Sequence, residues 1–101
     1  MFSNKKERYI TRAIADNLHM EIQILLWELI DRQQEQREEL DYLQVFELKK
    51  KHNQQLIIHR QEEPKRVREY TIVLRHGSPV NLTVWCIDDG SYQTMLFPND
   101  Y

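Results

Sequence analysis

The sequence predicts an α+β fold with a short N-terminal strand and one long helix packed on an antiparallel meander sheet of five or six strands. Two observations favour this fold class: one helical apolar stripe in the first third of the chain, and a run of short strand-like segments after residue 41. The chain has 101 residues, 41% of them hydrophobic and 30% charged, which suits a single domain over residues 1–101.

The first predicted elements are a strand over residues 8–15 and a helix that begins after Asp16 and Asn17, which can cap its first turn. The helix is the strongest signal in the chain, because apolar side chains recur every three or four residues along one face. These core-facing residues are Leu18, Ile22, Leu25, Leu26, Leu29 and Ile30. The polar residues 31–39 predict a solvated helical extension, after which Leu40 returns to the core.

Five strands are expected after residue 41, because β-branched and aromatic residues dominate segments that short polar breaks separate. The predicted strands span residues 42–48, 55–61, 70–75, 80–87 and 92–97. Such short connections favour antiparallel neighbours in chain order, with Asp89 and Gly90 as a two-residue turn in the last hairpin.

Side-chain alternation predicts the two faces of the later strands. A three-residue loop at Gly77-Ser78-Pro79 would place one set of side chains under the helix. That set is Tyr70, Ile72, Leu74, Leu82, Val84, Cys86, Met95 and Phe97. The opposite face would carry Thr71, Val73, Trp85, Ile87, Tyr92 and Leu96. This outer face is more apolar than a water-facing sheet surface should be.

Composition excludes several classes of protein. The net charge of −2 gives no overall attraction to nucleic acid or to an anionic membrane. The single cysteine excludes an intrachain disulfide and a cysteine-based zinc site, and it suits a reducing compartment. Residues 1–8 lack a signal-peptide pattern, and the longest apolar run, residues 24–27, is too short to span a bilayer. We therefore expect a cytoplasmic protein with no membrane partner.

No constellation of residues predicts catalysis, a metal ion or a cofactor. The histidines lack metal-ligand spacing, and His59 is expected to be partly buried and hydrogen-bonded. The four are His19, His52, His59 and His76. Cys86 lies mid-strand on the core face, where cysteine acts as a small hydrophobe. Asp88 and Asp89 precede Gly90 in a turn, which favours aspartate for backbone reasons. The sequence therefore favours a non-enzymatic protein.

A second apolar stripe on the helix predicts an interaction surface. Met20, Ile24 and Trp27 follow i, i+4, i+7 spacing opposite the core face, where a helix packed on one sheet should be polar. Either a partner chain or the terminal segments of this chain would cover them. Because aromatic residues and methionine are typical of interfaces, we expect a homo-oligomer or a protein that binds another protein, with Trp85 and Tyr92 as a second candidate surface.

Two alternative functions stay open. A basic end of the sheet is the candidate contact of a nucleic-acid-associated accessory protein. Its residues are Lys49, Lys50, Lys51, His52, Arg75 and His76. The second alternative is a small enzyme of unrecognised type, with a polar pocket that contains His59 between helix and sheet.

Several segments together resemble a known family. They are residues 7–12, 26–31 and 40–48, and the match extends to residues 57–59 and 94–101. The combination resembles an uncharacterised family of small bacterial proteins of about this length, domain of unknown function family 960, over nearly the whole chain. The resemblance implies a single-domain bacterial protein in the cytoplasm. It gives no residue a role, because the family has no assigned activity.

Overall fold

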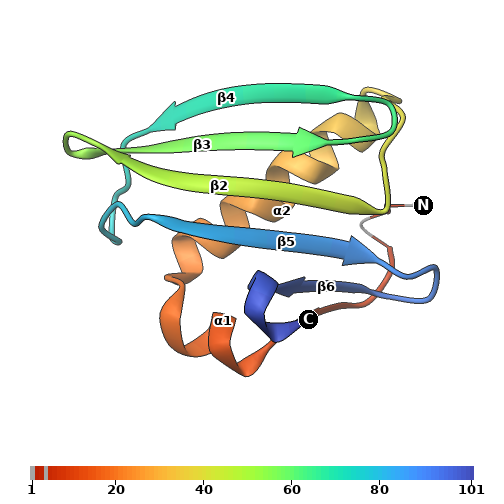
Figure 1. Ribbon diagram of the computed structural model, residues 1–101, viewed down its shortest axis with the longest axis horizontal. Helices are drawn as coiled ribbons and strands as arrows, with labels where there is room; N and C mark the ends of the chain where they lie inside the picture. Colours follow the sequence, from red (N-terminus) through yellow and green to blue (C-terminus); the bar gives the residue numbers. More distant parts are fainter. Residues whose placement is uncertain (1, 4) are drawn as a thin grey trace.

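The computed structural model describes residues 2–3 and 5–101, and it has two layers: a mixed six-stranded sheet and the helix α2, which passes behind it in Figure 1. The elements in chain order are β1 (Arg8–Ile10), α1 (Arg12–Asn17), α2 (Met20–Glu35), β2 (Leu43–Lys51), β3 (Gln54–Gln61), β4 (Arg66–Ile72), β5 (Leu82–Asp88), β6 (Gln93–Leu96) and the 3-10 turn η1 (Pro98–Asp100). The predicted α+β fold class is confirmed.

The helix α2 forms where the apolar spacing predicts it. The predicted core-facing residues are buried, except Leu25, which is partly buried. His19, rather than Asp16 or Asn17, caps the first turn, because its Nδ1 accepts a hydrogen bond from the N–H of Glu21 at 3.0 Å. The helix ends at Glu35, so only part of the polar extension is helical, and Gln33 within it is buried rather than solvated.

The predicted strand over residues 8–15 is wrong beyond Ile10. Only β1 is a strand, and it pairs in parallel with β6. Thr11 then starts the short helix α1, because its hydroxyl oxygen accepts a hydrogen bond from the N–H of Ile14 at 3.3 Å. Ile14 and Leu18 are four residues apart, so both reach the core from this turn and its end, and both are buried.

The strand order is β1-β6-β5-β2-β3-β4. Strands β2, β3 and β4 form a meander as predicted, but β5 does not continue it. The chain crosses back over residues 73–81 at one end of the sheet, and β5 pairs antiparallel with β2 (Figure 1). Gly77-Ser78-Pro79 is therefore part of a crossover, and the predicted hairpin loop there is wrong.

The predicted faces are nevertheless correct, except that Leu96, which was expected on the outer face and pairs with Trp85 there, is buried. Val84, Cys86 and Met95 are fully buried under α2, whereas Thr71 and Val73 are exposed. The remaining predicted core-face residues pack against the same core, partly buried: Tyr70, Ile72, Leu74, Leu82 and Phe97. Pairing with β2 sets the register of β5, because paired residues of neighbouring strands lie on the same face.

The last hairpin differs from the prediction in the length of its turn. Asp88 lies opposite Gln93, so four residues, 89–92, connect β5 to β6 instead of two. Gly90 has a φ of 101°, a left-handed conformation that glycine adopts without strain.

Candidate protein-interaction surfaces

The outer face of the sheet, opposite α2, is the first candidate surface. Strands β2 and β5 bury alternate side chains against the helix, and the residues between them point outward. The outward residues pair across the two strands, Leu43 with Ile87 and Val45 with Trp85. A sheet with one solvated face normally carries polar side chains there. In this sheet the outward positions 43, 45, 85 and 87 are apolar, whereas Glu47, Lys49 and Thr83 make the rest of the outer face of β2 and β5 polar.

Aromatic side chains extend this apolar area. Tyr9 and Tyr92 are 48% and 43% exposed, and their rings meet edge to face with centroids 5.2 Å apart. The ring of Trp85 meets that of Tyr101 at 5.9 Å. We call the whole set the outer sheet patch: Tyr9, Leu43, Val45, Trp85, Ile87, Tyr92 and Tyr101. Its composition is typical of protein interfaces.

Two charged side chains beside the patch, on β2 and β3, neutralise each other. Glu47 and Arg60 form an ion pair at 2.9 Å, although they come from different pairs of the β2–β3 register. This pair is satisfied within the chain, whereas Lys49 and Lys51, at the next outward positions of β2, are exposed.

The predicted helix stripe divides into an exposed part and a covered part. Met20 and Ile24 are 58% and 51% exposed. Trp27 is partly buried against the core, and the guanidinium of Arg8 lies 4.5 Å from the centroid of its ring. The N-terminal segment of the chain thus covers Trp27, whereas Met20 and Ile24 stay open to a partner.

Met20 and Ile24 border a groove of about 720 Å3 between α2 and the end of β4. We call it the α2–β4 groove. Its apolar lining comes from both elements and from the residues that follow β4: Met20, Ile24, Leu25, Ile72, Val73 and Leu74. His19, Arg75 and His76 line one end, and Glu28 lies on the α2 side two turns farther along the helix.

Glu21 holds the crossover against the start of α2. Its carboxylate accepts hydrogen bonds from the backbone N–H groups of Arg75, His76 and Gly77 at 2.7, 2.9 and 2.9 Å. These donors lower the pKa of Glu21 to about 2. A Cβ on Gly77 would lie 3.0 Å from Cγ of His19, so glycine permits this close approach. The wall of the α2–β4 groove is thereby fixed in place.

The basic residues named from the sequence gather at one end of the sheet. Lys49, Lys50 and Lys51 are exposed at the end of β2, and His52 is exposed in the β2–β3 turn. The crossover with the exposed Arg75 and His76 lies at the same end (Figure 1). The ionised Glu21 carboxylate binds the backbone there and offsets part of the positive charge.

The buried His59 belongs to the packed interior. It is 3% exposed, and its Nε2 lies 2.6 Å from Oε1 of Gln44. Its ring stacks on that of Phe46, with ring centroids 4.2 Å apart. Burial lowers its pKa to about 4, and the positive charges of Arg66 and Arg68 add to this effect. The predicted hydrogen bond of the imidazole is confirmed, and the ring is buried more completely than the partial burial expected.

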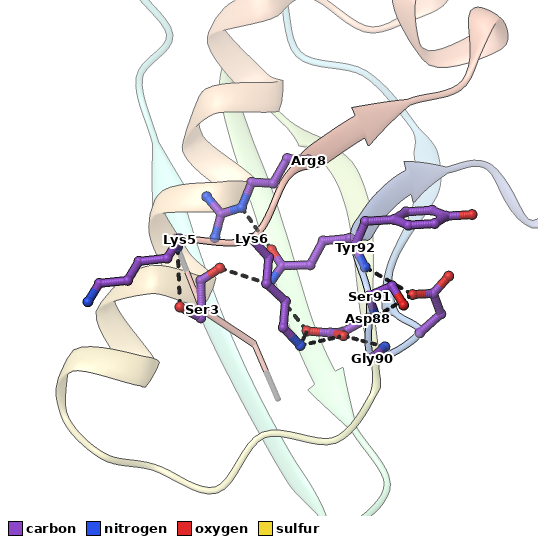
Figure 2. Close-up of polar contacts among 10 residues, drawn as sticks. Ser3, Lys5, Lys6, Arg8, Asp88, Gly90, Ser91 and Tyr92 are labelled. Carbon is purple, nitrogen blue, oxygen red and sulfur yellow. Dashed lines mark hydrogen bonds and ion pairs between the residues drawn. The ribbon is translucent and has the colours of Figure 1, made fainter.

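A polar network at the β5–β6 turn has a structural role (Figure 2). Asp88 is 1% exposed, and its two carboxylate oxygens lie 3.1 and 3.0 Å from Nζ of Lys6. The N–H of Gly90 and the side-chain amide of Gln93 also donate to Asp88, at 2.8 and 3.2 Å. Asp89 accepts hydrogen bonds from the N–H groups of residues 91 and 92. Both aspartates therefore bond within the turn as predicted.

The described residues offer little inorganic or thiol chemistry. Within residues 2–3 and 5–101, no three His, Cys, Asp or Glu side chains cluster as metal ligands. Complete burial raises the pKa of the Cys86 thiol. In the same part of the chain, no helix has the length and apolar character needed to cross a membrane.

Comparison with known proteins places the chain in a family. The family described as "Staphylococcal protein of unknown function (DUF960)" matches residues 7–100. The chain belongs to this family. The resemblance seen in the sequence is thus confirmed, and the DUF960 chain is of a bacterial type.

A solved structure has the same fold. It is the crystal structure of a protein of unknown function from Enterococcus faecalis, which is 19% identical in sequence and superposes with a TM-score of 0.87. The match covers 100% of the DUF960 chain and 98% of that chain. Comparison with curated proteins finds no match.

Sequence reasoning missed three features of the DUF960 chain. All three are contacts between residues more than 15 positions apart: Arg8 over Trp27, the Lys6–Asp88 ion pair, and the hydrogen bonds of Glu21 to the crossover. The crossover depended on strand order, which the pattern of short breaks had obscured. A lone glutamate in the first turn of a helix gave no signal of its contacts with residues 75–77.

Proposed function

We propose that this DUF960 protein is a small non-enzymatic interaction protein that self-associates through its outer sheet patch. The observation that carries the proposal is the apolar character of the outward positions on β2 and β5, around Trp85. Burying a large apolar side chain contributes about 1.5–3 kcal/mol relative to leaving it exposed. Leu43, Val45, Trp85 and Ile87 are already partly buried within the chain, so covering their remaining surface contributes part of this amount for each. The sum over the patch favours a covered state.

A second copy of the chain is a suitable partner for the patch. Sheets pack face to face at a distance of about 10 Å, with side chains of both faces interdigitating. The four strand residues Leu43, Val45, Trp85 and Ile87 carry no charge, so the centre of the patch does not select a charged partner. An apolar, sheet-shaped partner is what this surface accepts, and the same patch on a second copy is such a surface.

The size of the sheet is adequate for a dimer. With a spacing of about 4.8 Å between strands and about 3.4 Å per residue, the six strands of three to nine residues cover roughly 600 Å2 in projection. Side chains that stand out from the sheet add to this area. The result is of the order of the ~800 Å2 per partner found in stable interfaces.

The test compares a substitution of the partly buried Ile87 with one of the exposed Ile24, in light scattering at matched concentration. Ile87→Thr keeps a β-branched residue in β5 but lowers the apolar area of the patch, so we expect a smaller species than wild type. Ile24→Gln removes an exposed side chain from α2 and should leave the oligomer unchanged. If Ile24→Gln dissociates the protein and Ile87→Thr does not, the outer sheet patch is not the interface.

A further inference from the structure

The free edge of the sheet beside the α2–β4 groove is charged in the first half of β4 and uncharged from residue 70 to residue 74. Strand β4 ends the strand order, so in the described part of the chain its outer edge has no neighbouring strand. Its first half carries Arg66 and Arg68, both in ion pairs with Glu38, at 3.3 and 2.7 Å. Charged side chains on an edge strand oppose the addition of another strand. Residues 70–74 carry no charge, and the last three of them line the groove.

From this juxtaposition we infer that the α2–β4 groove binds an extended segment of another protein as an added strand. The segment pairs with the backbone of residues 70–74 and directs alternate apolar side chains into the groove. There they pack on Ile24, Leu25 and Leu74. Strand addition of this kind takes affinity from main-chain hydrogen bonds and specificity from pockets for alternate side chains.

The dimensions of the groove suit a short extended segment. His19 and Glu28 mark its two ends on α2, and nine residues of helix span about 13 Å. An extended chain covers that distance with about four residues, of which two point to the same face. The expected occupant therefore places two apolar side chains, at positions i and i+2, between α2 and the sheet.

The charges at the two ends of the groove specify the flanks of the segment. Arg75 lines one end with His19, Glu21 and His76, and three backbone N–H groups hold the carboxylate of Glu21 in place there, whereas no carboxylate pairs with the guanidinium of Arg75 among the described residues. An acidic residue of the segment is complementary to this end, and a basic residue is complementary to Glu28 at the other. The partner is thus a protein segment with an acidic flank, an alternating apolar centre and a basic flank.

The wall of the groove is preorganised in the unbound protein. The carboxylate of Glu21 binds the backbone of residues 75–77 at the start of α2, and Gly77 lies close to the side chain of His19. These contacts fix the wall of the groove without a ligand. A fixed wall lowers the ordering cost of binding. This site is separate from the outer sheet patch, so it goes beyond the proposed self-association and does not depend on it.

The experiment uses a phage library of random nine-residue peptides as the probe and the full chain as the target. We expect enriched peptides to carry apolar residues at alternate positions with an acidic flank. The most enriched peptide, synthesised with a fluorescent label, should bind Ile24→Gln at least roughly tenfold more weakly than wild type. Ile87→Thr, which alters only the outer sheet patch, should bind it like wild type even where it no longer self-associates.

Charge exchange tests the direction in which the segment lies. Arg75→Gln should weaken binding of the acidic peptide, and the loss should disappear when the acidic residue of the peptide is replaced by glutamine. Met20→Gln provides a second groove variant if Ile24→Gln fails to fold, which circular dichroism reveals. The inference is overturned if no peptide is enriched over an empty selection, or if the apolar residues follow helical i, i+3, i+4 spacing. It is also overturned if the groove variants bind as wild type does.

Discussion

Replacing the buried His59 by glutamine should flatten the pH dependence of stability. In the folded protein the imidazole is neutral, lies against Oε1 of Gln44 and stacks on Phe46. Burial, with Arg66 and Arg68 nearby, lowers its pKa, because a charged imidazole would lose water and meet like charges. Glutamine can donate a hydrogen bond to Gln44 but does not titrate.

The magnitude follows from the pKa of His59 in the folded and unfolded states. The folded value of about 4 lies about 2.5 below the ordinary value of 6.5. Between these values the unfolded chain binds more protons than the folded chain, so acid favours unfolding. The stability that neutral His59 contributes is complete above pH 6.5 and is lost as the pH falls toward 4. From pH 7 to pH 5 the loss is about 2 kcal/mol.

Urea unfolding of both proteins at pH 7, 6 and 5 measures this loss. Wild type should lose about 2 kcal/mol more than His59→Gln over that range. His52→Asn is the matched control, because His52 is exposed in a turn with a φ of 57°, which asparagine tolerates. The control should keep the slope of the wild type. Parallel curves for wild type and His59→Gln would refute the reasoning.

Three further outcomes follow from the polar contacts and the core. Lys6→Met leaves the Asp88 carboxylate buried without its cation, so the free energy of unfolding should fall by about 2 kcal/mol in urea titration; an unchanged value would contradict the ion pair. Glu21→Gln should raise the rate of amide hydrogen exchange at residues 75–77. The wild type should keep its protection there at pH 4, because the pKa of the Glu21 carboxyl is about 2 and its stabilising effect is lost only as the pH falls through that value. Iodoacetamide should leave Cys86 unmodified at pH 8 until urea unfolds the chain; rapid alkylation of the native protein would place the thiol at the surface.

Much of the fold follows from local patterns in the sequence. The apolar spacing of α2 was decisive because a helix of 16 residues repeats its signal over four turns. The strands were recognisable from their β-branched residues, and alternation assigned the faces of β5 and β6 correctly. The short segment around Thr11 was assigned wrongly, because one helical turn and a strand can bury the same few apolar residues.

Strand order depends on contacts that no local pattern encodes. The break after β4 looked like a hairpin, yet residues 73–81 cross the end of the sheet and bind the start of α2. The predicted core-facing sides of the strands are nevertheless correct, because a strand with alternating apolar residues buries the same side whichever strand it pairs with. An odd or even loop length was not the reason.

The sequence predicts some residues of the candidate surfaces but not how the fold arranges them. The helical spacing of Met20, Ile24 and Trp27 grouped three side chains that tertiary contacts separate, since Arg8 covers Trp27. The groove beside Ile24 arises only when the crossover is folded against α2, so no sequence pattern predicts it. Trp85 and Tyr92 remain predictions as interface residues.

The molar mass of the wild-type chain as a function of concentration is the decisive measurement for self-association. We expect light scattering coupled to size exclusion to give twice the mass of a single chain at tens of micromolar, and we expect dilution to dissociate this dimer. The fluorescence of the two tryptophans should shift to longer wavelength on dilution, because Trp85 becomes exposed to water. A mass of one chain at every concentration up to the millimolar range would contradict self-association through the outer sheet patch.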